Sequence, residues 1–565
     1  MNIRILSYSI VAGLVVAVPL AAFVALCSVG KLLAYPCFNV FGISPKAVGV
    51  AYAVLSFCSV FFVCYSILTR GESILERFDF QKGRFGKSFT FSKRSVGATT
   101  FLIFVCWLPV VILLFPCSTT PVDTGNQLFQ FFTPAPTTYM GTWIDAEFID
   151  HHPVFDTILF GAFVSVGRAL GSDALGMVAY ALFQSLLWAF AMAFSVCYLD
   201  RLGVPPFIRV VAFFFATFFP NFPFNADTMQ KDSIFTPFFI FFLIGCVEMV
   251  RTKGRAAGST RFCVFFALAV LFCILTKKLG AFGVVPSDFA LIVACGFCRA
   301  RLLVSAAVPV FVGCVLIPMF VFPVLSVAPG GSQEMLGFCY QQSITVLKKA
   351  PQSMTEDDKK ILESVLDTKA ALKAFIPYKT DPVKSKARQS AAFGDYLAYF
   401  CMWARQGMMH PIIYLTSIAK CCGPLLVPSK PLGLPTEMVS KKQIEKFDKK
   451  AKEVGHRFTL DAEKPPLLKK LTDSIKTFHY DGLCTIPVLS LFLTAGFYTY
   501  WIPVIALAIL LGLKKGRFAI ALVPVLISSL LLLLSPTDIA RYALQFAPVV
   551  ILETGVVIFA LRDRS

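Results

Sequence analysis

Long apolar runs separated by short polar segments dominate the hydrophobic pattern of the chain. A membrane-spanning helix needs about 20 mostly apolar residues. Twelve runs reach or approach that length: 5–28, 46–68, 97–116, 173–198, 206–220, 233–250, 262–276, 281–298, 302–326, 484–512, 517–535 and 540–561. The pattern therefore predicts an all-α polytopic membrane protein with about 12 transmembrane helices.

The composition supports this reading and excludes several classes of protein. The chain is 57% hydrophobic and 15% charged, whereas a soluble protein is typically about 45–50% apolar and about 25% charged. Its mean hydropathy is +0.73. These values exclude a cytosolic enzyme and a nucleic-acid-binding domain, so we expect no nucleic acid among the partners. The net charge of +19 is then first a signal of membrane topology.

Basic residues cluster in a subset of the loops and so predict the orientation of the helices. They lie in residues 70–96, in 251–261, at Arg299 and Arg301, at 514–517 and at Arg562 and Arg564. The positive-inside rule places all of these in the cytoplasm. We therefore expect a multi-pass protein of the cell membrane with both termini cytoplasmic.

Two apolar segments complicate this topology. Residues 153–170 resemble a further span, but counting them as one would move the basic loop 251–261 outside, so we expect an amphipathic or re-entrant helix on the outer face. Residues 484–512 are long enough for one tilted helix or a broken pair. An even number of crossings favours a single span there.

Four segments follow from this topology. We expect an N-terminal pair of membrane helices with a basic cytoplasmic loop (1–96), a membrane core (97–326) with a first outer loop (117–172), a largely helical extracytoplasmic domain (327–483), and C-terminal transmembrane helices (484–565). The outer domain carries an excess of basic residues, and long translocated segments are exempt from the positive-inside rule. Membrane lipids are expected partners throughout.

Several motifs of soluble chemistry are missing from the chain. No GxxxxGK[ST], no GxGxxG after a strand and no GxSxG occurs. One CxxC, Cys295 and Cys298, has no second pair, whereas a structural zinc site takes four ligands. Energy or an activated substrate must therefore reach this protein in a form that needs no nucleotide-binding fold.

Polar residues gather at the predicted outer ends of the spans, in five groups. They are Asp123; Asp145, Glu147, Asp150, His151, His152 and Asp156; Asp227, Lys231 and Asp232; Lys277 and Lys278; and Asp538, Arg541 and Tyr542. Each group has a structural alternative, such as a helix-capping aspartate or a snorkelling lysine. Their common face predicts a site at the outer leaflet. A transporter would instead place charged residues near mid-span. Few ionisable residues interrupt the spans here; Glu248 and Glu553 are exceptions, and Glu248 is near an inner end.

The order of these groups resembles a bacterial family of polytopic membrane proteins. That family is itself similar to the GT-C glycosyltransferases, the class of protein mannosyltransferases and lipid-A aminoarabinose transferases. The resemblance covers roughly residues 100–550. It is carried by Asp123, Gln127, Gln130, the HHP of 151–153, the KD of 231–232, Glu334, Gln341 and Gln342, the YKTDPVK of 378–384, the HPIIYL of 410–415 and the RYAL of 541–544.

The resemblance implies a fold, a reaction and a set of roles. GT-C enzymes take a sugar from a polyprenyl-phosphate donor on the outer face, with a carboxylate in the first outer loop as base or metal anchor. Asp123 fits that place, with Asp150 and Asp145 as rivals, and Asp232 or Asp227 fits the assisting acid. The resemblance further implies donor-phosphate contacts from Lys231, Lys277, Lys278 and Arg541, and substrate contacts from Gln127, His151, His152, Gln341, Gln342 and Tyr542.

The functional prediction is a membrane glycosyltransferase that inverts the anomeric carbon and delivers sugar to a cell-envelope glycan or protein. Whether it also holds a divalent cation is left open. The alternatives are a lipid or polysaccharide transporter or flippase, and a polymerase or ligase of cell-surface glycans. An outer-face cavity beside Asp123, Lys231 and Arg541 would favour transfer, whereas a continuous polar path through the bilayer would favour transport.

Overall fold

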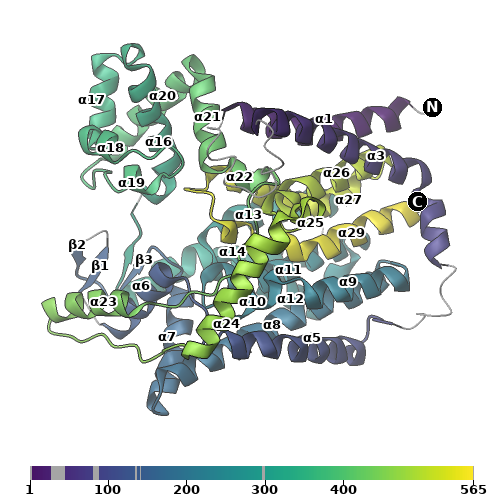
Figure 1. Ribbon diagram of the computed structural model, residues 1–565, viewed down its shortest axis with the longest axis horizontal. Coiled ribbons are helices and arrows are strands. Elements are labelled where there is room, and N and C mark those ends of the chain that lie inside the picture. The colour runs from purple at the N-terminus through teal and green to yellow at the C-terminus, as the bar shows by residue number, and fades with distance from the viewer. Residues whose placement is uncertain are drawn as a thin grey trace.

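The computed structural model describes residues 3–26, 45–79, 88–133, 136–139, 142–295, 300–331 and 333–563. Helices make up most of this structure, and the four strands have three residues each. Figure 1 shows a bundle of helices on one side and two lobes on the other. Several residues that the sequence singled out lie outside the described residues. They are the basic residues of 80–87, Arg299, Arg564 and Cys298, the second cysteine of the CxxC.

Eight helices in the described chain are long and apolar enough to cross a membrane. They are the Ala53–Phe78 part of α3 (Pro45–Asp79), α5 (Lys93–Leu113), α8 (Asp173–Arg201), α11 (Lys231–Arg251), α13 (Lys278–Cys295), the run Ala300–Val324, the run Gly516–Leu534 and the run Ala540–Arg562, which ends in α29 (Phe546–Arg562). The protein is therefore a multi-pass helical membrane protein, as the apolar pattern predicts.

The remaining four predicted spans are helical but shorter or bent. The helices α9 (Pro206–Phe218) and α10 (Asn221–Asp227) meet at 50° and together are apolar enough for a ninth span. The others are apolar helices of 10–17 residues: Ile3–Pro19 of α1 (Ile3–Leu26), α12 (Thr260–Thr276) and Phe497–Gly512, which ends in α26 (Ile502–Gly512). Residues 484–512 are interrupted after α25 (Pro487–Phe492), so they form no single long helix. The total of twelve crossings stays a prediction.

Helix α11 lies at the centre of the bundle. Its sequence is apolar on every face, as a helix surrounded by other helices requires, and almost all of its residues are buried. It packs against α8, α12, α13 and α29. Its first turn, Lys231 and Asp232, therefore lies among the ends of several neighbouring helices. At the edge of the bundle, α1 packs along α3 and α26 (Figure 1).

Residues 117–172 contain a short helix, three strands and a longer helix. Helix α6 (Pro121–Phe132) begins with a proline at its first turn, a position where the missing N–H costs no hydrogen bond. Strands β1 (Thr137–Tyr139) and β2 (Thr142–Ile144) form an antiparallel pair. Strand β3 (Phe148–Asp150) leads into α7 (Val154–Ala169), which packs on α6 and α8. The helix predicted at 153–170 is present.

Residues 327–483 contribute to two hydrophobic cores. Helices α16 (Gln333–Lys349), α17 (Glu356–Val365), α18 (Thr368–Ala374), α19 (Asp381–Lys384), α20 (Phe393–Met409) and α21 (Pro411–Cys421) form one lobe around buried residues such as Tyr340, Leu362 and Tyr399. The chain then passes through α22 (Gly423–Leu426) to α23 (Lys441–Glu453), which packs on α6 through Phe447. Residues 327–483 thus do not share one core.

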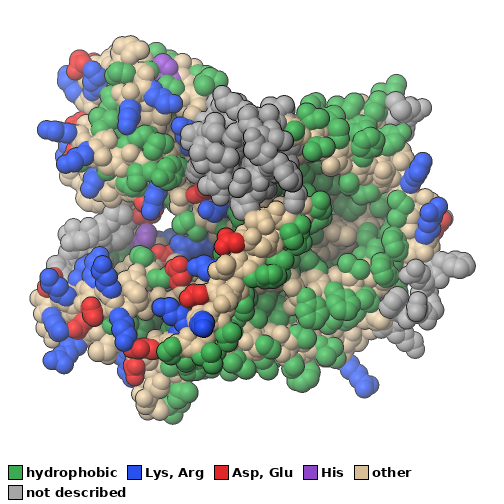
Figure 2. Space-filling model, in the orientation of Figure 1, with side chains coloured by type: hydrophobic (Ala, Val, Ile, Leu, Met, Phe, Trp, Pro, Cys, Tyr) green, Lys and Arg blue, Asp and Glu red, His purple; other side chains and the backbone are tan. Residues whose placement is uncertain are grey.

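A parallel strand pair joins residues 117–172 to the start of this lobe. Strand β4 (Val327–Pro329) pairs with β3 in the register Asp150 to Pro329. Figure 2 shows charged side chains concentrated on the two lobes, apolar side chains over the bundle, and a hollow between the lobes that carries Lys, Arg, Asp, Glu and His side chains. The hollow is therefore a recessed polar surface, in contrast to the apolar surface of the bundle.

Candidate functional site

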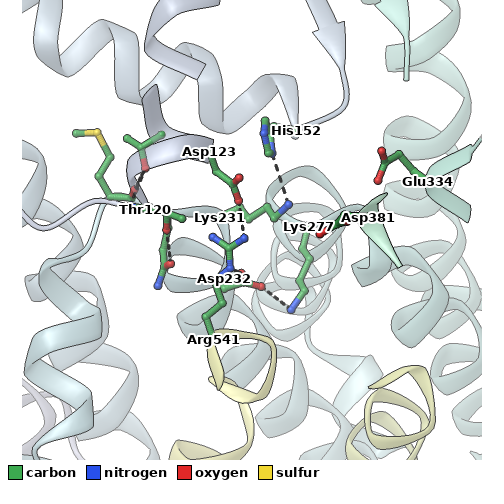
Figure 3. Close-up of polar contacts among 12 residues, drawn as sticks. Thr120, Asp123, His152, Lys231, Asp232, Lys277, Glu334, Asp381 and Arg541 are labelled. Atoms are coloured by element: carbon green, nitrogen blue, oxygen red, sulfur yellow. Dashed lines mark hydrogen bonds and ion pairs between the residues drawn. The ribbon is translucent and has the colours of Figure 1, made fainter. Parts of the chain in front are cut away.

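Charged residues from four distant segments meet where helices begin. Asp123 lies in the first turn of α6, and Lys231 and Asp232 open α11. Lys277 is the extended residue between α12 and α13, and Arg541 lies in the 3₁₀ turn η10 (Ala540–Ala543) before α29. Together with His152, just before α7, we call these six residues the rim cluster (Figure 3).

Ion pairs connect two carboxylates of the rim cluster through one arginine. An Nη of Arg541 lies 2.6 Å from an Oδ of Asp123, although 418 residues separate them in the chain. The Nε of the same guanidinium lies 3.9 Å from Asp232, whose other oxygen is 2.8 Å from the Nζ of Lys277. Asp232 is fully buried, and a buried carboxylate needs such partners to stay charged.

Lys231 differs from the other two cations of the cluster. Its Nζ lies 3.5 Å from Nδ1 of His152, and no described carboxylate pairs with it at ion-pair distance. Burial, reinforced by the positive charge of Lys231, holds the pKa of His152 well below its usual value. The imidazole is therefore neutral at pH 7, so Nδ1 can accept a hydrogen bond from the ammonium. Three cations against two carboxylates leave the rim cluster with one uncompensated positive charge.

Asp123 is the carboxylate whose ionised form is best stabilised. Burial alone would raise its pKa, but the charges of Arg541 and Lys231 outweigh burial and hold the pKa well below its usual range. Its place in the first turn of α6 adds the favourable field of a helix N-terminus. Asp123 is thus ionised across the physiological pH range.

A second acid near the cluster has the opposite character. Asp156, in the first turn of α7, is fully buried, and neither of its carboxyl oxygens has a hydrogen-bond partner among the described residues. Burial raises its pKa well above the usual value, although Lys231 acts against that rise. Burial therefore favours the protonated form of Asp156, in the same region where Asp123 is ionised.

Two sets of ion pairs joined by a polar contact, which we call the ion-pair chain, lead from the rim cluster toward the α16–α21 lobe. The Nζ of Lys278 lies 2.8 Å from Asp150. Nδ1 of His151 lies 3.8 Å from Glu334, which is a polar contact because burial lowers the pKa of His151. Glu334 in turn binds Lys384 at 2.7 Å. Burial raises the pKa of Asp150 despite its lysine partner. Lys277 and Lys278, adjacent in sequence, thus serve separate partners.

One family model matches residues 8–564 of this chain, that of a family of unknown function called DUF6020. The chain belongs to this family. No curated protein and no solved structure matches it. The roles of residues in this DUF6020 protein therefore have to be argued from its own geometry.

The rim cluster contains about half of the residues that the sequence singled out. It unites Asp123, Lys231, Asp232, Lys277 and Arg541 with His152. Asp150, His151 and Lys278 belong to the adjoining ion-pair chain. The ring of Tyr542 lies with its centroid 5.5 Å from the guanidinium carbon of Arg541.

The other candidates have structural contacts elsewhere. Gln127 donates to Thr157 and so links α6 to α7. Gln341 donates to the carbonyl of Ile376, and Gln342 accepts from Trp403, so both lie within the α16–α21 lobe and away from the rim cluster. These contacts favour structural roles over the substrate contacts that the resemblance implies.

The rival carboxylates also separate from the rim cluster. Asp227 is fully buried and accepts a hydrogen bond from the backbone N–H of Ser118 at 2.8 Å, which holds the loop before α6. Asp145 is exposed, and Asp538 lies 3.9 Å from Lys430. Of the proposed carboxylates, Asp123 and Asp232 are the ones that share an arginine.

Two observations extend what sequence reasoning found. Asp288 lies in α13 and, like Glu553 in α29, is buried with no hydrogen-bond partner in the described chain. Asp288 is an ionisable residue inside a predicted span, and that feature of the sequence could have identified it. Within the described ranges, no three His, Cys, Asp or Glu side chains are grouped as metal ligands would be.

Proposed function

We propose that this DUF6020 protein is a membrane glycosyltransferase, which moves a sugar from a polyprenyl-phosphate-linked donor to a cell-envelope acceptor on the outer face, with inversion at the anomeric carbon. A GT-C-like membrane core with 12 crossings and two cytoplasmic termini is part of this proposal. The basic residues of Arg251 to Arg261 lie at the end of α11 opposite to Lys231, which supports that orientation.

The observation that carries the proposal is the uncompensated ammonium of Lys231 next to the ionised Asp123. A phosphate bound there would take the remaining positive charge of the rim cluster, whose members lie at the N-termini of α6, α11 and α13. Helix N-termini and lysines favour phosphate. A carboxylate within the same cluster supplies an acceptor for a proton.

The residues of the rim cluster can assist different parts of a single displacement reaction. The acceptor oxygen bonds to the anomeric carbon, the bond from that carbon to the phosphate oxygen breaks, and the departing phosphate takes the electron pair. Lys231 stabilises the charge that develops on the phosphate, and Asp123 takes the proton of the acceptor hydroxyl. Because its pKa is lowered, Asp123 is a weak base. Proton transfer is therefore completed once the new bond has made the hydroxyl acidic.

Transport is the second candidate, and the buried carboxylates of the bundle favour it. Asp288 and Glu553 lie within candidate spans and have no hydrogen-bond partner among the described residues. Intramembrane acids of this kind are found in proton-coupled carriers. A lipid or polysaccharide flippase would use them, whereas a glycan polymerase or ligase would use the rim cluster in the same way as a transferase.

The decisive experiment is donor cleavage by the purified protein in lipid nanodiscs. We expect wild-type protein to release sugar label from at least one member of a panel of polyprenyl-phosphate sugars. Asp123→Asn lowers that rate about 100-fold or more, the size of a general-base effect. The matched control is Asp145→Asn, the same chemical change at an exposed carboxylate, which keeps the rate within twofold.

Two outcomes would count against the transferase. Cleavage of no donor in the panel by a folded wild-type protein contradicts the proposed reaction. Equal rates in Asp123→Asn and wild type remove Asp123 from the mechanism. Proton-coupled lipid movement that depends on Asp288 or Glu553, in the absence of donor cleavage, would support the transport alternative.

A further inference from the structure

A cavity of about 250 Å³ opens beside Arg541. Five segments line it: the start of α6, the stretch from α10 to α11, the extended residues 432–437, the end of α24 (Pro466–Thr477) with η5 (Phe478–Gly482), and residues 539–544 around η10. Its lining includes Asn221, Asn225, Gln230, Gly433, Tyr480 and Arg541. Sequence patterns do not predict this cavity, because its lining comes from regions far apart in the chain.

The lining of the cavity combines apolar and polar side chains, and its charge is close to neutral. Amides and hydroxyls dominate its polar groups, among them Asn221, Asn225 and Gln230. Of its charged residues, Glu437 lies 3.8 Å from Lys476, and Arg541 is paired with Asp123. No described cation of the lining is therefore without a carboxylate, in contrast to Lys231. An anion gains little here, whereas a neutral ligand with hydroxyl groups matches the lining.

Three buried polar atoms of the lining residues have no hydrogen-bond partner in the described chain. They are Oδ1 of Asn221, an acceptor, and Nε and Nη1 of Arg541, both donors, of which Nε lies 3.9 Å from Asp232. The amide of Asn221 is held in place, since its Nδ2 donates to the carbonyl of Gly433 at 2.6 Å. Buried polar groups are normally satisfied. A hydroxyl can both donate and accept, so a ligand with several hydroxyls would satisfy Oδ1 of Asn221 and Nη1 of Arg541.

The cavity and the lysines lie on opposite sides of the Asp123–Arg541 pair. Figure 3 shows Thr120, a lining residue, on one side of that pair, and His152, Lys277 and Glu334 on the other. Thr120 donates to Gln230 at 2.8 Å, so this side of the site is held together by neutral hydrogen bonds. The two sides thus differ in charge while sharing Asp123 and Arg541 at their boundary.

We propose that the cavity binds the acceptor, as a neutral, hydroxyl-bearing unit the size of one hexose ring. This inference rests on the proposed glycosyl transfer. Inversion by one displacement requires the attacking hydroxyl and the leaving phosphate to lie on opposite faces of the anomeric carbon. A phosphate on the lysine side therefore places the acceptor on the cavity side, where Asp123 can receive its proton.

Gly433 provides a way to fill the cavity without removing any of its polar groups. A Cβ at this position would lie 3.7 Å from the Tyr480 hydroxyl and 4.0 Å from the Ala540 Cβ, both ordinary contact distances between lining residues. A leucine side chain here projects into the cavity, and the backbone carbonyl that accepts from Asn221 is retained. Gly394, whose Cβ would meet nothing within 4 Å, offers the same substitution at an open position.

The first test measures binding without catalysis. Saturation-transfer NMR is recorded on wild type, Gly433→Leu and Gly394→Leu in nanodiscs, with the methyl glycosides of glucose, galactose and mannose as probes. We expect at least one probe to give a signal with wild type and Gly394→Leu, and that signal to fall at least fivefold with Gly433→Leu. No signal from wild type, or equal signals from both leucine variants, overturns the proposal.

The second test separates the acceptor site from the transferase itself. With the donor that wild type cleaves, Gly433→Leu raises the acceptor KM at least tenfold and leaves the donor KM and the acceptor-free hydrolysis of donor within twofold. A rise in the donor KM alone assigns the cavity to the donor and overturns the inference while the transferase stands. If sugars bind in the Gly433-dependent manner but no donor is cleaved, the transferase fails and the sugar site remains.

Discussion

The two ends of α11 carry ionic clusters that differ in how completely their polar groups are paired. At its start lies the rim cluster, with Lys231 and Asp232. At its end, roughly 30 Å away for 21 residues, Glu248 meets Arg251, Arg201 and Tyr198, and we call these four residues the basal cluster. The same helix thus supports both, which makes the clusters a natural comparison.

The basal cluster is closed. Both carboxyl oxygens of Glu248 accept from Arg251 at 2.8 Å, Tyr198 donates to it at 2.7 Å, and Arg201 lies 3.3 Å away. The bidentate arginine is the strongest geometry available to a carboxylate. Every lone pair of Glu248 has a partner from α8 or α11 itself, so this cluster binds two helices together and needs no ligand.

The rim cluster is open. Lys231 has a neutral imidazole as its partner, and Nε2 of His152 and Nη1 of Arg541 have no partner among the described residues. Its members come from α6, α11, α12–α13 and η10, and no two adjacent helices complete it. An unpaired buried polar group lowers the stability of the folded protein. Several such groups beside a cavity are therefore better explained by the binding of a ligand than by a contribution to stability.

Removal of the basal carboxylate provides the largest expected effect on stability. Glu248→Gln leaves Arg251 and Arg201 without their anion, and breaking a buried pair costs about 3 kcal/mol. We expect a lower apparent Tm and lower abundance, with an unchanged KM for donor in the protein that remains folded. The control is Glu356→Gln, which removes an exposed carboxylate paired with Lys359. A Tm equal to that of wild type would contradict a structural role for the basal cluster.

Neutralising Lys231 should act on binding and leave stability unchanged. Lys231→Gln removes the one uncompensated charge of the rim cluster, so we expect the donor KM to rise about tenfold, equivalent to about 1.4 kcal/mol, at constant apparent Tm. Lys278→Gln serves as the matched variant, because Lys278 is paired with the half-exposed Asp150, and its KM rises about twofold. Equal KM changes in the two variants would contradict the larger contribution to donor binding that we expect from Lys231.

The pH dependence of stability offers the smallest and most specific test. Burial raises the pKa of Asp156 in the folded protein, whereas in the unfolded chain the carboxyl group ionises above about pH 3.9. Its contribution to stability is therefore lost as the pH rises, and Asp156→Asn gains apparent Tm relative to wild type between pH 4 and pH 7. The slope is at most about 1.4 kcal/mol per pH unit.

His152 should behave in the opposite sense. Its pKa is lowered in the folded protein, so its contribution is lost as the pH falls below about 6.5. His152→Gln therefore gains apparent Tm relative to wild type as the pH falls from 7 to 5. Parallel slopes for the two variants would contradict the assignment of a protonated acid and a neutral imidazole to the same site.

Much of the architecture followed from the apolar pattern, because a bilayer demands long apolar helices. Each of the twelve predicted runs coincides with helical structure in the described residues. A helix also follows His152, where the basic loop 251–261 argued against a further span. The sequence left one tilted helix or a broken pair open for 484–512, and the division of 327–483 between two cores was not predicted. Both depend on packing against distant segments, which periodicity does not report.

For the candidate site, the sequence supplied the side chains but not their pairing. Asp123, Lys231, Asp232, Lys277 and Arg541 were each identified by charge at the edge of an apolar run. Gln341 and Gln342 came from the resemblance alone, and they lie inside the α16–α21 lobe. The role of His152 depended on finding Lys231 beside it, and the cavity next to Gly433 required five segments to converge.

By itself, the sequence determined that this protein is a helical membrane protein. The length and apolarity of a run are local properties, and they decide whether a helix can cross a bilayer. Only the tertiary structure decided which charges neutralise one another. Electrostatic interactions depend on distance and burial in three dimensions, and residues as far apart in the chain as Asp123 and Arg541 are brought together by the packing of α6, α11 and η10. That packing leaves Lys231 without a carboxylate and gives the site its charge.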